Sequence, residues 1–460
     1  MVHNILKEVE TQALALATNR TGSEMLQELL GFSPLKPLCQ IWAALCSNFR
    51  FVACHRCGVH VLQSALLQLP RLLVNPKEEV EEEEEEDGKN GTLEALEKLV
   101  LGLASEVCDD FLFYCGDTHG SFVVRTLLQS LKPDFGIPFR QNNYFCSLLT
   151  VFITDKISSF CFQVALQILH RKLPHVCADL CNTTIGYLST RNASADGSPL
   201  LLFLRDQTSS RLLDPALEAI LAQGHTGVVV ALVGACRRVG AHQTQILQLL
   251  LEAFHCAKPS SRQVACVPLF ATLMAYEVYY GLTEEEGAVP TEHQVEIAMT
   301  RALGEVTVLG SLLLQHLLHF STPGLVLRSL GSLTGPQLLS LAQSPAGSHV
   351  VDAILTSPSV TRKPRRRVLQ TLKGQYVALA CSRHGSRVLD AIWNGAALGA
   401  RKEIAAELGE QNQELIRDPF GHHVARNVAL TTFLKRREAW EQQQNAVAKR
   451  RRALNSILED

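Results

Sequence analysis

A nine-residue motif recurs along the chain, and this recurrence restricts the fold more than any other feature of the sequence. Each copy starts with a small residue, which we number zero, followed by a polar pair, two aliphatic residues and then Gln, Asp or Arg at position +5. The copies start at Gly22, Gly58, Gly120, Ser158, Ser209, Gly310, Gly347, Gly385 and Gly421. Repetition at a nearly constant period is the signature of a solenoid, in which each unit packs only on its neighbours. We therefore expect a stack of similar units in place of a single globular core.

The spacing of the motifs gives the number of units and the domain organisation. The uninterrupted intervals are 36 to 38 residues long. Longer intervals contain an acidic segment, 76–91, and a turn-rich segment, 191–199, which we expect to be loop insertions. The interval from Ser209 to Gly310 has room for two degenerate repeats, at about 220–300. We predict about eleven units in a solenoid of residues 1–434. A basic helical tail, 435–460, is expected to follow, either as a capping helix or as a partly ordered segment.

Helical periodicity divides the motif into two stripes. Successive residues of a helix are about 100° apart, so positions +3, +4, +7 and +8 lie on one side. These positions are aliphatic, and this apolar stripe must face the core. Positions +1, +2 and +5 lie on the nearly opposite side, and we call them the polar stripe. Sustained alternation of apolar and polar residues is almost absent, so strands are not expected. The predicted fold class is all-α, with two or three helices in each unit.

The polar stripe is restricted in residue type, which packing against a core does not explain. At +1 the candidate binding residues are Ser23, Ser121, Ser159, Ser210, Ser311, Ser348, Ser386 and His422. At +2 they are mostly flat: His60, Phe122, Phe160, Arg211, His349, Arg387 and His423. At +5 they are Gln27, Gln63, Arg125, Gln163, Asp214, Gln315, Asp352, Asp390 and Arg426. Short hydrogen-bonding groups beside a flat side chain suit a nucleobase, which offers edges for hydrogen bonds and a face for stacking.

The motif resembles the second helix of the Pumilio-type RNA-binding repeat, and the resemblance extends from Leu14 to about Leu434. The number of units, the degenerate middle and the basic end resemble the nucleolar, eleven-repeat branch of that family. The resemblance implies a curved α-solenoid in which +1 and +5 contact base edges and +2 stacks between bases. It also implies a monomeric nuclear and nucleolar protein that binds single-stranded or partly structured precursor ribosomal RNA in small-subunit biogenesis. Such a protein would work without catalysis or a cofactor, alongside ribosome-assembly proteins.

The chain departs from the pattern of base-specific Pumilio proteins at several positions. Asp replaces the longer Gln or Glu at +5 in three units, and its shorter side chain has less reach. Val59 at +1 cannot form a side-chain hydrogen bond, and Glu24 and Leu312 at +2 are poor stacking groups. We therefore expect weaker discrimination between RNA sequences, with a larger contribution from contacts to the RNA backbone.

The distribution of charge supports an anionic partner for the C-terminal part. The net charge of the whole chain is −2, but the acidic segment 77–90 carries much of the negative charge. From Thr361 to the end, 19 Lys and Arg residues stand against 10 Asp and Glu residues. This basic part of the chain suits binding to nucleic acid.

Other functions are weighed against RNA binding. Cys54 and Cys57 have metal-ligand spacing, with His55 and His60 nearby, but no second CxxC pair exists; we interpret them as packing and turn residues and expect no metal. Phosphate-binding glycine loops, zinc-protease motifs and nucleophile elbows are absent from the sequence, so an enzyme is not expected.

A protein-binding solenoid of HEAT or armadillo type is the main alternative, although its repeats are longer, about 40–47 residues. In a third interpretation, a Pumilio fold would bind RNA or DNA through basic surfaces such as Arg365–Arg367. The chain has no apolar run that is long enough to span a membrane, and its N-terminal segment does not resemble a secretory signal. We therefore expect neither membrane insertion nor secretion.

Overall fold

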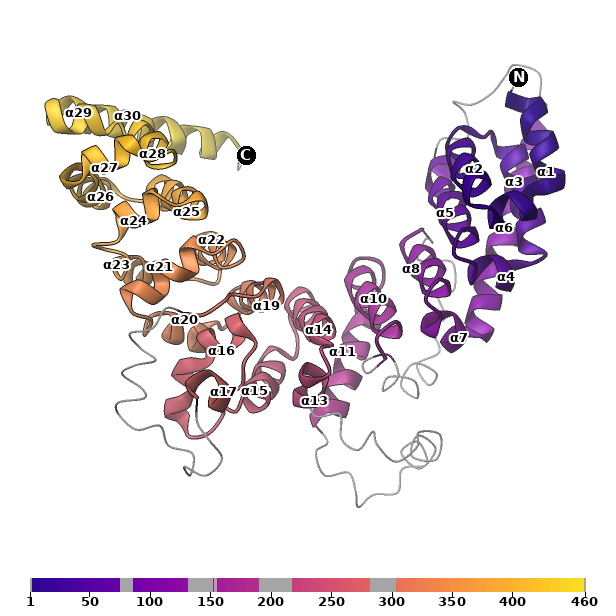
Figure 1. The fold of residues 1–460 in the computed structure, drawn as a ribbon, viewed down its shortest axis with the longest axis horizontal. Helices are drawn as coiled ribbons and strands as arrows, with labels where there is room; N and C mark the ends of the chain where they lie inside the picture. The colour runs from indigo at the N-terminus through magenta and orange to yellow at the C-terminus, as the bar shows by residue number, and fades with distance from the viewer. Residues whose placement is uncertain are drawn as a thin grey trace. The chain divides into compact units, whose positions relative to one another are not determined.

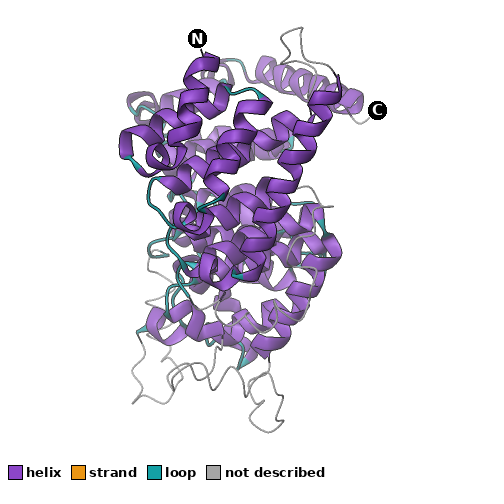
Figure 2. Cartoon of the chain, turned by 90° about the vertical axis from the view of Figure 1, so that its right-hand side faces the viewer, coloured by secondary structure: helices purple, strands orange, loops and turns teal. Residues whose placement is uncertain are grey.

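The computed structural model describes residues 2–74, 86–130, 152, 155–189, 217–281 and 303–458. The secondary structure of these residues is helical and includes no strand (Figure 2). None of the helices in the described ranges is long and apolar enough to cross a membrane. The chain divides into two compact units, Met1–Val239 and Gly240–Asp460, which we call unit 1 and unit 2. The predicted all-α class is confirmed, whereas the number of repeats stays a prediction.

In unit 1 the helices that carry the motif, the motif helices, lie side by side in one row (Figure 1). This row is α2 (Arg20–Phe32), α5 (Gly58–Val74), α8 (Gly120–Ser130), α10 (Ser158–Lys172) and then α14 (Thr226–Val239). The short helices α4 (Phe49–Ala53) and α7 (Phe111–Gly116), and the longer α1 (Val2–Thr18), pack on the motif helices that follow them. The other helices of unit 1 are α3 (Leu35–Cys46), α6 (Glu86–Asp109), α11 (Pro174–Ser189) and α13 (Leu217–Ala222).

Unit 2 repeats this arrangement. Its row of adjacent helices is α16 (Cys266–Thr272), α19 (Val308–Leu318), α22 (Ser348–Thr356), α25 (Arg383–Gly395) and α28 (Gly421–Asn427). The helices α21 (Gly335–Gln343), α24 (Tyr376–Ala380) and α27 (Asn412–Arg417) pack on the motif helices that follow them. The remaining helices are α15 (Gln243–Ala253), η2 (Ser260–Ala265), α17 (Tyr276–Tyr280), α20 (Gly324–Leu330), α23 (Arg362–Gln370), α26 (Leu398–Glu410), α29 (Leu430–Lys435) and α30 (Arg437–Leu458).

The small residue at position zero is required by a close contact between helices. A Cβ atom added to Gly22 or Gly58 would lie 2.8 or 2.7 Å from the carbonyl oxygen of the residue six positions earlier. Gly120, Gly347, Gly385 and Gly421 also face the carbonyl six residues upstream. Since real Cβ atoms do not approach a backbone oxygen this closely, glycine lets these six motif helices lie against the segment that precedes them.

A polar side chain three residues before position zero caps each described motif helix. The carboxylate of Asp117 accepts from the backbone N–H of Gly120 at 2.7 Å, and the hydroxyl of Ser382 accepts from that of Gly385 at 2.9 Å. The full set at position −3 is Asn19, His55, Asp117, Asp155, Thr307, Ser344, Ser382 and Asp418. Such caps typically stabilise a helix by about 1 kcal/mol each.

The apolar stripe forms the core, as its spacing predicts. In α8 all four positions, Val123, Val124, Leu127 and Leu128, are buried, and the same holds for the corresponding positions of α5, α10, α19 and α25. Met25, at +3 of α2, is an exception with 61% of its surface exposed. Because α2 is the first motif helix of the row, it has a motif helix on one side only.

Basic side chains cap the C-terminal ends of several motif helices, where backbone carbonyls lack partners within the helix. Lys172 donates to the carbonyls of Leu128 and Gln129 at the end of α8. Arg365 donates to Ile354 and to the loop that follows α22, at 3.0 Å. The predicted basic surface at Arg365–Arg367 therefore includes one guanidinium that is already used to hold the fold together.

Three parts of the predicted organisation can be compared with the structure. Residues 86–91 of the expected acidic loop insertion form the first turns of α6. The motif predicted at Ser209 lies outside the described residues, and α14 takes the place beside α10. In the expected tail, the indole of Trp440 is fully buried and donates to the carbonyl of Val428 at 2.8 Å. The first half of α30 is therefore packed on the fold, as a capping helix would be.

Candidate nucleic-acid interface

The serines at +1 are less available than the other two positions of the polar stripe. Five of them have an exposed fraction between 1% and 7%, namely Ser23, Ser121, Ser159, Ser311 and Ser348. Four of these hydroxyls donate to the backbone carbonyl three residues earlier, as Ser159 does to Lys156 at 2.9 Å. Ser386 makes the same bond from a half-buried position. Because a hydroxyl has a single proton, these groups are left with only the role of acceptor.

The side chains at +2 and +5 of unit 1 are exposed or half-buried and contact one another across the motif helices. The rings of His60 on α5 and Phe122 on α8 meet edge to face, with centroids 5.9 Å apart. The Arg125 guanidinium lies over the ring of Phe122 at 4.3 Å and is farther, at 5.8 Å, from the ring of Phe160 on α10. Phe160 is 47% exposed. Three successive motif helices thus present a continuous series of flat groups.

The amides at +5 of unit 1 are held in defined orientations. The Nε2 of Gln63 donates to the hydroxyl of Thr126 at 3.1 Å, and its Oε1 lies 3.0 Å from the Nδ1 of His60. Gln27 donates to the carbonyl of Ser23 within its own helix, at 3.1 Å. The amide of Gln163 lies against Gly227 at the start of α14. These contacts reduce the entropy that the side chains would lose on binding a ligand.

The polar stripe of unit 2 is dominated by charged side chains. The Nδ1 of His349 lies 3.7 Å from a carboxylate oxygen of Asp352, one turn further along α22. Asp390 on α25 accepts from the amide of Asn427 on α28, at 3.3 and 3.4 Å. Arg387, His423 and Arg426 are exposed, and the rings of His422 and His423 lie 3.8 Å apart. Gln315 donates to the hydroxyl of Ser311 at 3.0 Å.

The pKa of Asp390 is raised above its ordinary value because burial disfavours the carboxylate, although the hydrogen bond from Asn427 lowers the pKa in part. Asp390 is half-buried, so its carboxylate costs free energy unless it has hydrogen-bond donors, and the amide of Asn427 supplies one.

Three predicted site residues, Ser210, Arg211 and Asp214, lie outside the described residues. The helix that packs beside α10 is α14, and it has Val228, Val229 and Leu232 after Gly227 in place of a polar stripe. All three are buried. The described part of the middle of the chain thus supports the predicted row of helices but adds no polar triplet to it.

The histidine beside Cys54 and Cys57 has a structural role. The Nδ1 of His55 accepts from the backbone N–H groups of Cys57 and Gly58, at 3.2 and 3.3 Å, and so caps α5. Burial is the largest cause that raises the pKa of Cys54, to about 11, so the thiol is held in its neutral form. Among the described residues, no group of three or more His, Cys, Asp or Glu side chains could hold a metal ion.

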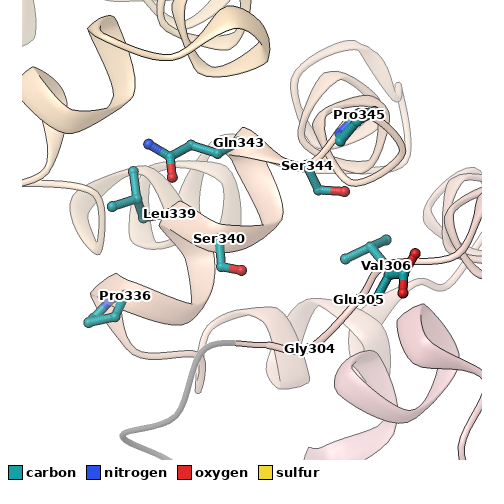
Figure 3. A pocket seen from close by; sticks show the side chains of 9 residues that line it. All are labelled: Gly304, Glu305, Val306, Pro336, Leu339, Ser340, Gln343, Ser344 and Pro345. Carbon is teal, nitrogen blue, oxygen red and sulfur yellow. The ribbon is translucent and has the colours of Figure 1, made fainter.

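A cavity of about 480 Å³ lies in unit 2, apart from the polar stripe (Figure 3). It is formed by residues 304–306 and by α21 with the turn that follows it, including Leu339, Ser340 and Pro345. None of its lining residues is at +1, +2 or +5 of a motif. The cavity contains no paired titratable groups of the kind that catalysis uses, and we assign it no part in the interface.

The sequence interpretation missed two further positions. The caps at −3 were readable, because Asn, Asp, Ser and Thr are the residues that favour helix starts. Position +6 was not readable: Thr126 and Asn427 contact the +5 side chain of the preceding motif helix, and the sequence does not indicate which side chains meet across two neighbouring helices.

The rows of adjacent motif helices, with a polar stripe on the side opposite the core, define an α-helical repeat protein of the Pumilio class. The sequence also matches the family described as "NOP9-like PUF repeat domain" over residues 11–140 and 142–423. This match covers most of the chain, so the protein belongs to the NOP9-like PUF repeat family, and the predicted resemblance is confirmed.

Relatives and solved structures agree with this assignment. The chain is 71% identical to nucleolar protein 9 of Homo sapiens and 68% identical to that of Mus musculus, covering 100% of the chain and 87% of each relative. Both are named for the nucleolus, in agreement with the expected nuclear and nucleolar localisation. The alignment with the human protein extends over 553 positions, more than the 460 residues of the chain, so the human protein has additional residues within the aligned span.

A solved complex of APUM23 with GGAGUUGACGG has the same fold, with a TM-score of 0.51 and 21% identity over 97% of the chain and 95% of that structure. At this level of identity the likeness concerns the fold alone.

Proposed function

We propose that the protein is a non-catalytic RNA-binding factor that holds single-stranded or partly structured precursor ribosomal RNA during small-subunit biogenesis. The polar stripe, at positions +1, +2 and +5, is the proposed binding surface. The protein would act as a monomer in the nucleolus, alongside ribosome-assembly proteins and without a cofactor. The family match, the nucleolar names of the relatives and the RNA in the APUM23 complexes support this proposal.

The series His60, Phe122, Arg125 and Phe160 is the observation that carries the proposal. Its members come from three separate motif helices and are at least partly open to solvent. Exposed aromatic rings with a guanidinium among them are costly for a soluble surface, but they give a stacking platform for bases. Since α5, α8 and α10 each place such a group on the polar stripe, a single strand would meet them one after another.

The test is RNA binding by a variant that lacks the two rings. Labelled GGAAUUGACGG, an RNA bound by APUM23 in a solved complex, is titrated at two salt concentrations against the wild type and Phe122→Ala/Phe160→Ala. Stacking of a base on an aromatic side chain is worth roughly 1–3 kcal/mol, so the double variant should bind at least about 30-fold more weakly. Duplex DNA of the matching sequence should bind more weakly to the wild type.

The control is a pair of exposed phenylalanines away from the polar stripe. Phe51 and Phe113 lie on α4 and α7, are 59% and 42% exposed, and are not part of any motif. Phe51→Ala/Phe113→Ala should leave the affinity within about twofold. Equal losses of affinity in both variants would mean that the polar stripe is not the RNA-binding surface. Absence of RNA binding by a protein with its helical spectrum intact would favour the alternative, a solenoid that binds proteins.

A further inference from the structure

A chain of hydrogen bonds runs from α8 to the solvent-exposed ring of His60 on α5. The hydroxyl of Thr126 lies 2.8 Å from the backbone carbonyl of Phe122. The Nε2 of Gln63 lies 3.1 Å from the same hydroxyl. The Oε1 of Gln63 lies 3.0 Å from the Nδ1 of His60. Thr126 itself is 3% exposed, so ligands do not reach it directly.

The direction of this chain is determined by its buried end. A carbonyl oxygen can only accept, so the single proton of the Thr126 hydroxyl is donated to Phe122. The hydroxyl oxygen must then accept from Gln63, which requires the amide nitrogen to face Thr126. The amide oxygen consequently faces His60, and the Nδ1 of His60 must carry a proton to donate to it.

A neutral imidazole has one N–H group, so a proton on Nδ1 leaves Nε2 of His60 as a bare acceptor. The side chain of His60 is exposed on the polar stripe. Its ring is inclined by 61° to that of Phe122, whereas a base held between two rings needs them nearly parallel. His60 therefore presents an edge with an acceptor to a ligand, and the stacking face beside it belongs to Phe122.

We propose that Thr126 is a positioning residue that makes His60 a hydrogen-bond acceptor for a donor group of bound RNA, either a base N–H or a ribose 2′-hydroxyl. This proposal rests on the proposed function and deepens it at one repeat. A phosphate oxygen has no proton to give and is excluded as the partner of neutral His60. The 2′-hydroxyl is the group by which such a site would distinguish RNA from DNA.

The same contact between positions +6 and +5 of adjacent motif helices recurs in unit 2. Thr126 is at position +6 of its motif and contacts the +5 side chain of the preceding motif helix, Gln63. Asn427 is also at +6 and contacts Asp390, the +5 side chain of the preceding motif helix. Thr126 accepts from an amide and Asn427 donates to a carboxylate, so each +6 residue has the polarity that its +5 partner requires. Position +6 thus controls the orientation of a +5 group in both units.

The first test concerns the tautomer of His60 and needs no RNA. The full-length protein is labelled with ¹⁵N-histidine, and the His60 signals are assigned by their loss in His60→Gln. We expect a proton on Nδ1 in the wild type and in Thr126→Ser, which keeps the acceptor. In Thr126→Val the amide of Gln63 is released, and a mixture of both tautomers is expected. A proton on Nε2 in the wild type, or an unchanged tautomer in Thr126→Val, would overturn the proposed positioning.

The second test measures affinity for GGAAUUGACGG and for the same sequence with 2′-deoxyribose throughout. One hydrogen bond is worth about 1 kcal/mol, so Thr126→Val should bind the RNA about fivefold more weakly, and Thr126→Ser should bind within twofold of the wild type. If the loss persists on the deoxy strand, the donor is a base N–H; if it disappears there, the donor is the 2′-hydroxyl.

Equal losses for Thr126→Ser and Thr126→Val would show that Thr126 acts only through packing, and would overturn the proposal. Failure of the wild type to bind RNA would instead overturn the proposed function. In that case the tautomer measurement still decides whether Thr126 orients His60.

Discussion

Unit 1 and unit 2 share one scaffold but present different chemistry at the polar stripe. Both have glycine at position zero of most motifs, caps at −3 and a buried apolar stripe. At +2, unit 1 has aromatic rings on α8 and α10, whereas unit 2 has His349, Arg387 and His423. At +5, unit 1 has amides and one arginine, whereas α22 and α25 carry aspartates. The comparison shows that one scaffold accommodates different residue types at +2 and +5.

The largest effect is expected from the shared scaffold, at position zero. The Cβ of Gly58→Ala would lie 2.7 Å from the carbonyl of Val52, and that of Gly385→Ala 2.5 Å from the carbonyl of Leu379. Displacing the backbone should lower the free energy of unfolding by about 1–3 kcal/mol in each case. Urea denaturation of the two variants measures this loss.

Gly102→Ala is the matched control, because no atom lies within 4 Å of the new Cβ on α6. It should gain up to about 1 kcal/mol, the difference in helix propensity between glycine and alanine. A destabilised Gly58→Ala with an unaffected Gly385→Ala would mean that the two units do not share this packing device.

A smaller effect is expected when the acidic groups of unit 2 are neutralised. Asp352→Asn/Asp390→Asn removes two negative charges from the polar stripe, where they repel phosphates. Affinity for GGAAUUGACGG should rise by about threefold at low salt and by less at high salt, because salt screens the repulsion. Glu410→Gln, an exposed acid on α26, should change affinity little. A lower affinity in the double variant would show that the carboxylates accept from bases and contribute to recognition.

The smallest effect concerns the pH dependence of stability. Burial raises the pKa of Asp390 in the folded protein, so the folded state binds a proton more readily than the unfolded state does. The contribution of this group to stability therefore falls as the pH rises from its ordinary pKa, near 4, through the raised value. In Asp390→Asn this decrease in stability with rising pH should disappear. Thermal unfolding measured across that pH range would show this. An unchanged pH dependence of stability in this variant would contradict the raised pKa of Asp390.

The sequence predicted the features that depend on local periodicity. The apolar stripe, the motif helices and the exposed +2 residues all follow from the 3.6-residue period and are present in the structure. The family resemblance followed from the same stripe, because it recurs with the same three residue types.

Features that depend on contacts between distant segments were beyond the sequence. The +1 serines are buried in the folded protein, and their hydroxyls bond to a carbonyl one turn earlier. Residue type alone made Ser159 and Ser348 look accessible, because it does not show this burial. Arg365 looked like a surface cation, but its guanidinium bonds three carbonyls. Helix α14 gave no readable motif, because the positions that would form its polar stripe, Val228, Val229 and Leu232, are apolar and buried.

The glycine at position zero has a consequence for how variation in such a protein should be interpreted. A methyl group added there displaces a whole helix, whereas an exchange at +2 or +5 leaves the helix where it was. In a comprehensive mutational scan, positions that do not tolerate substitution should therefore recur every 36 to 38 residues in the uninterrupted stretches. The most constant columns of an alignment would then be the positions that hold the helices together. The residues that give each member its own RNA preference would lie in the variable columns between them.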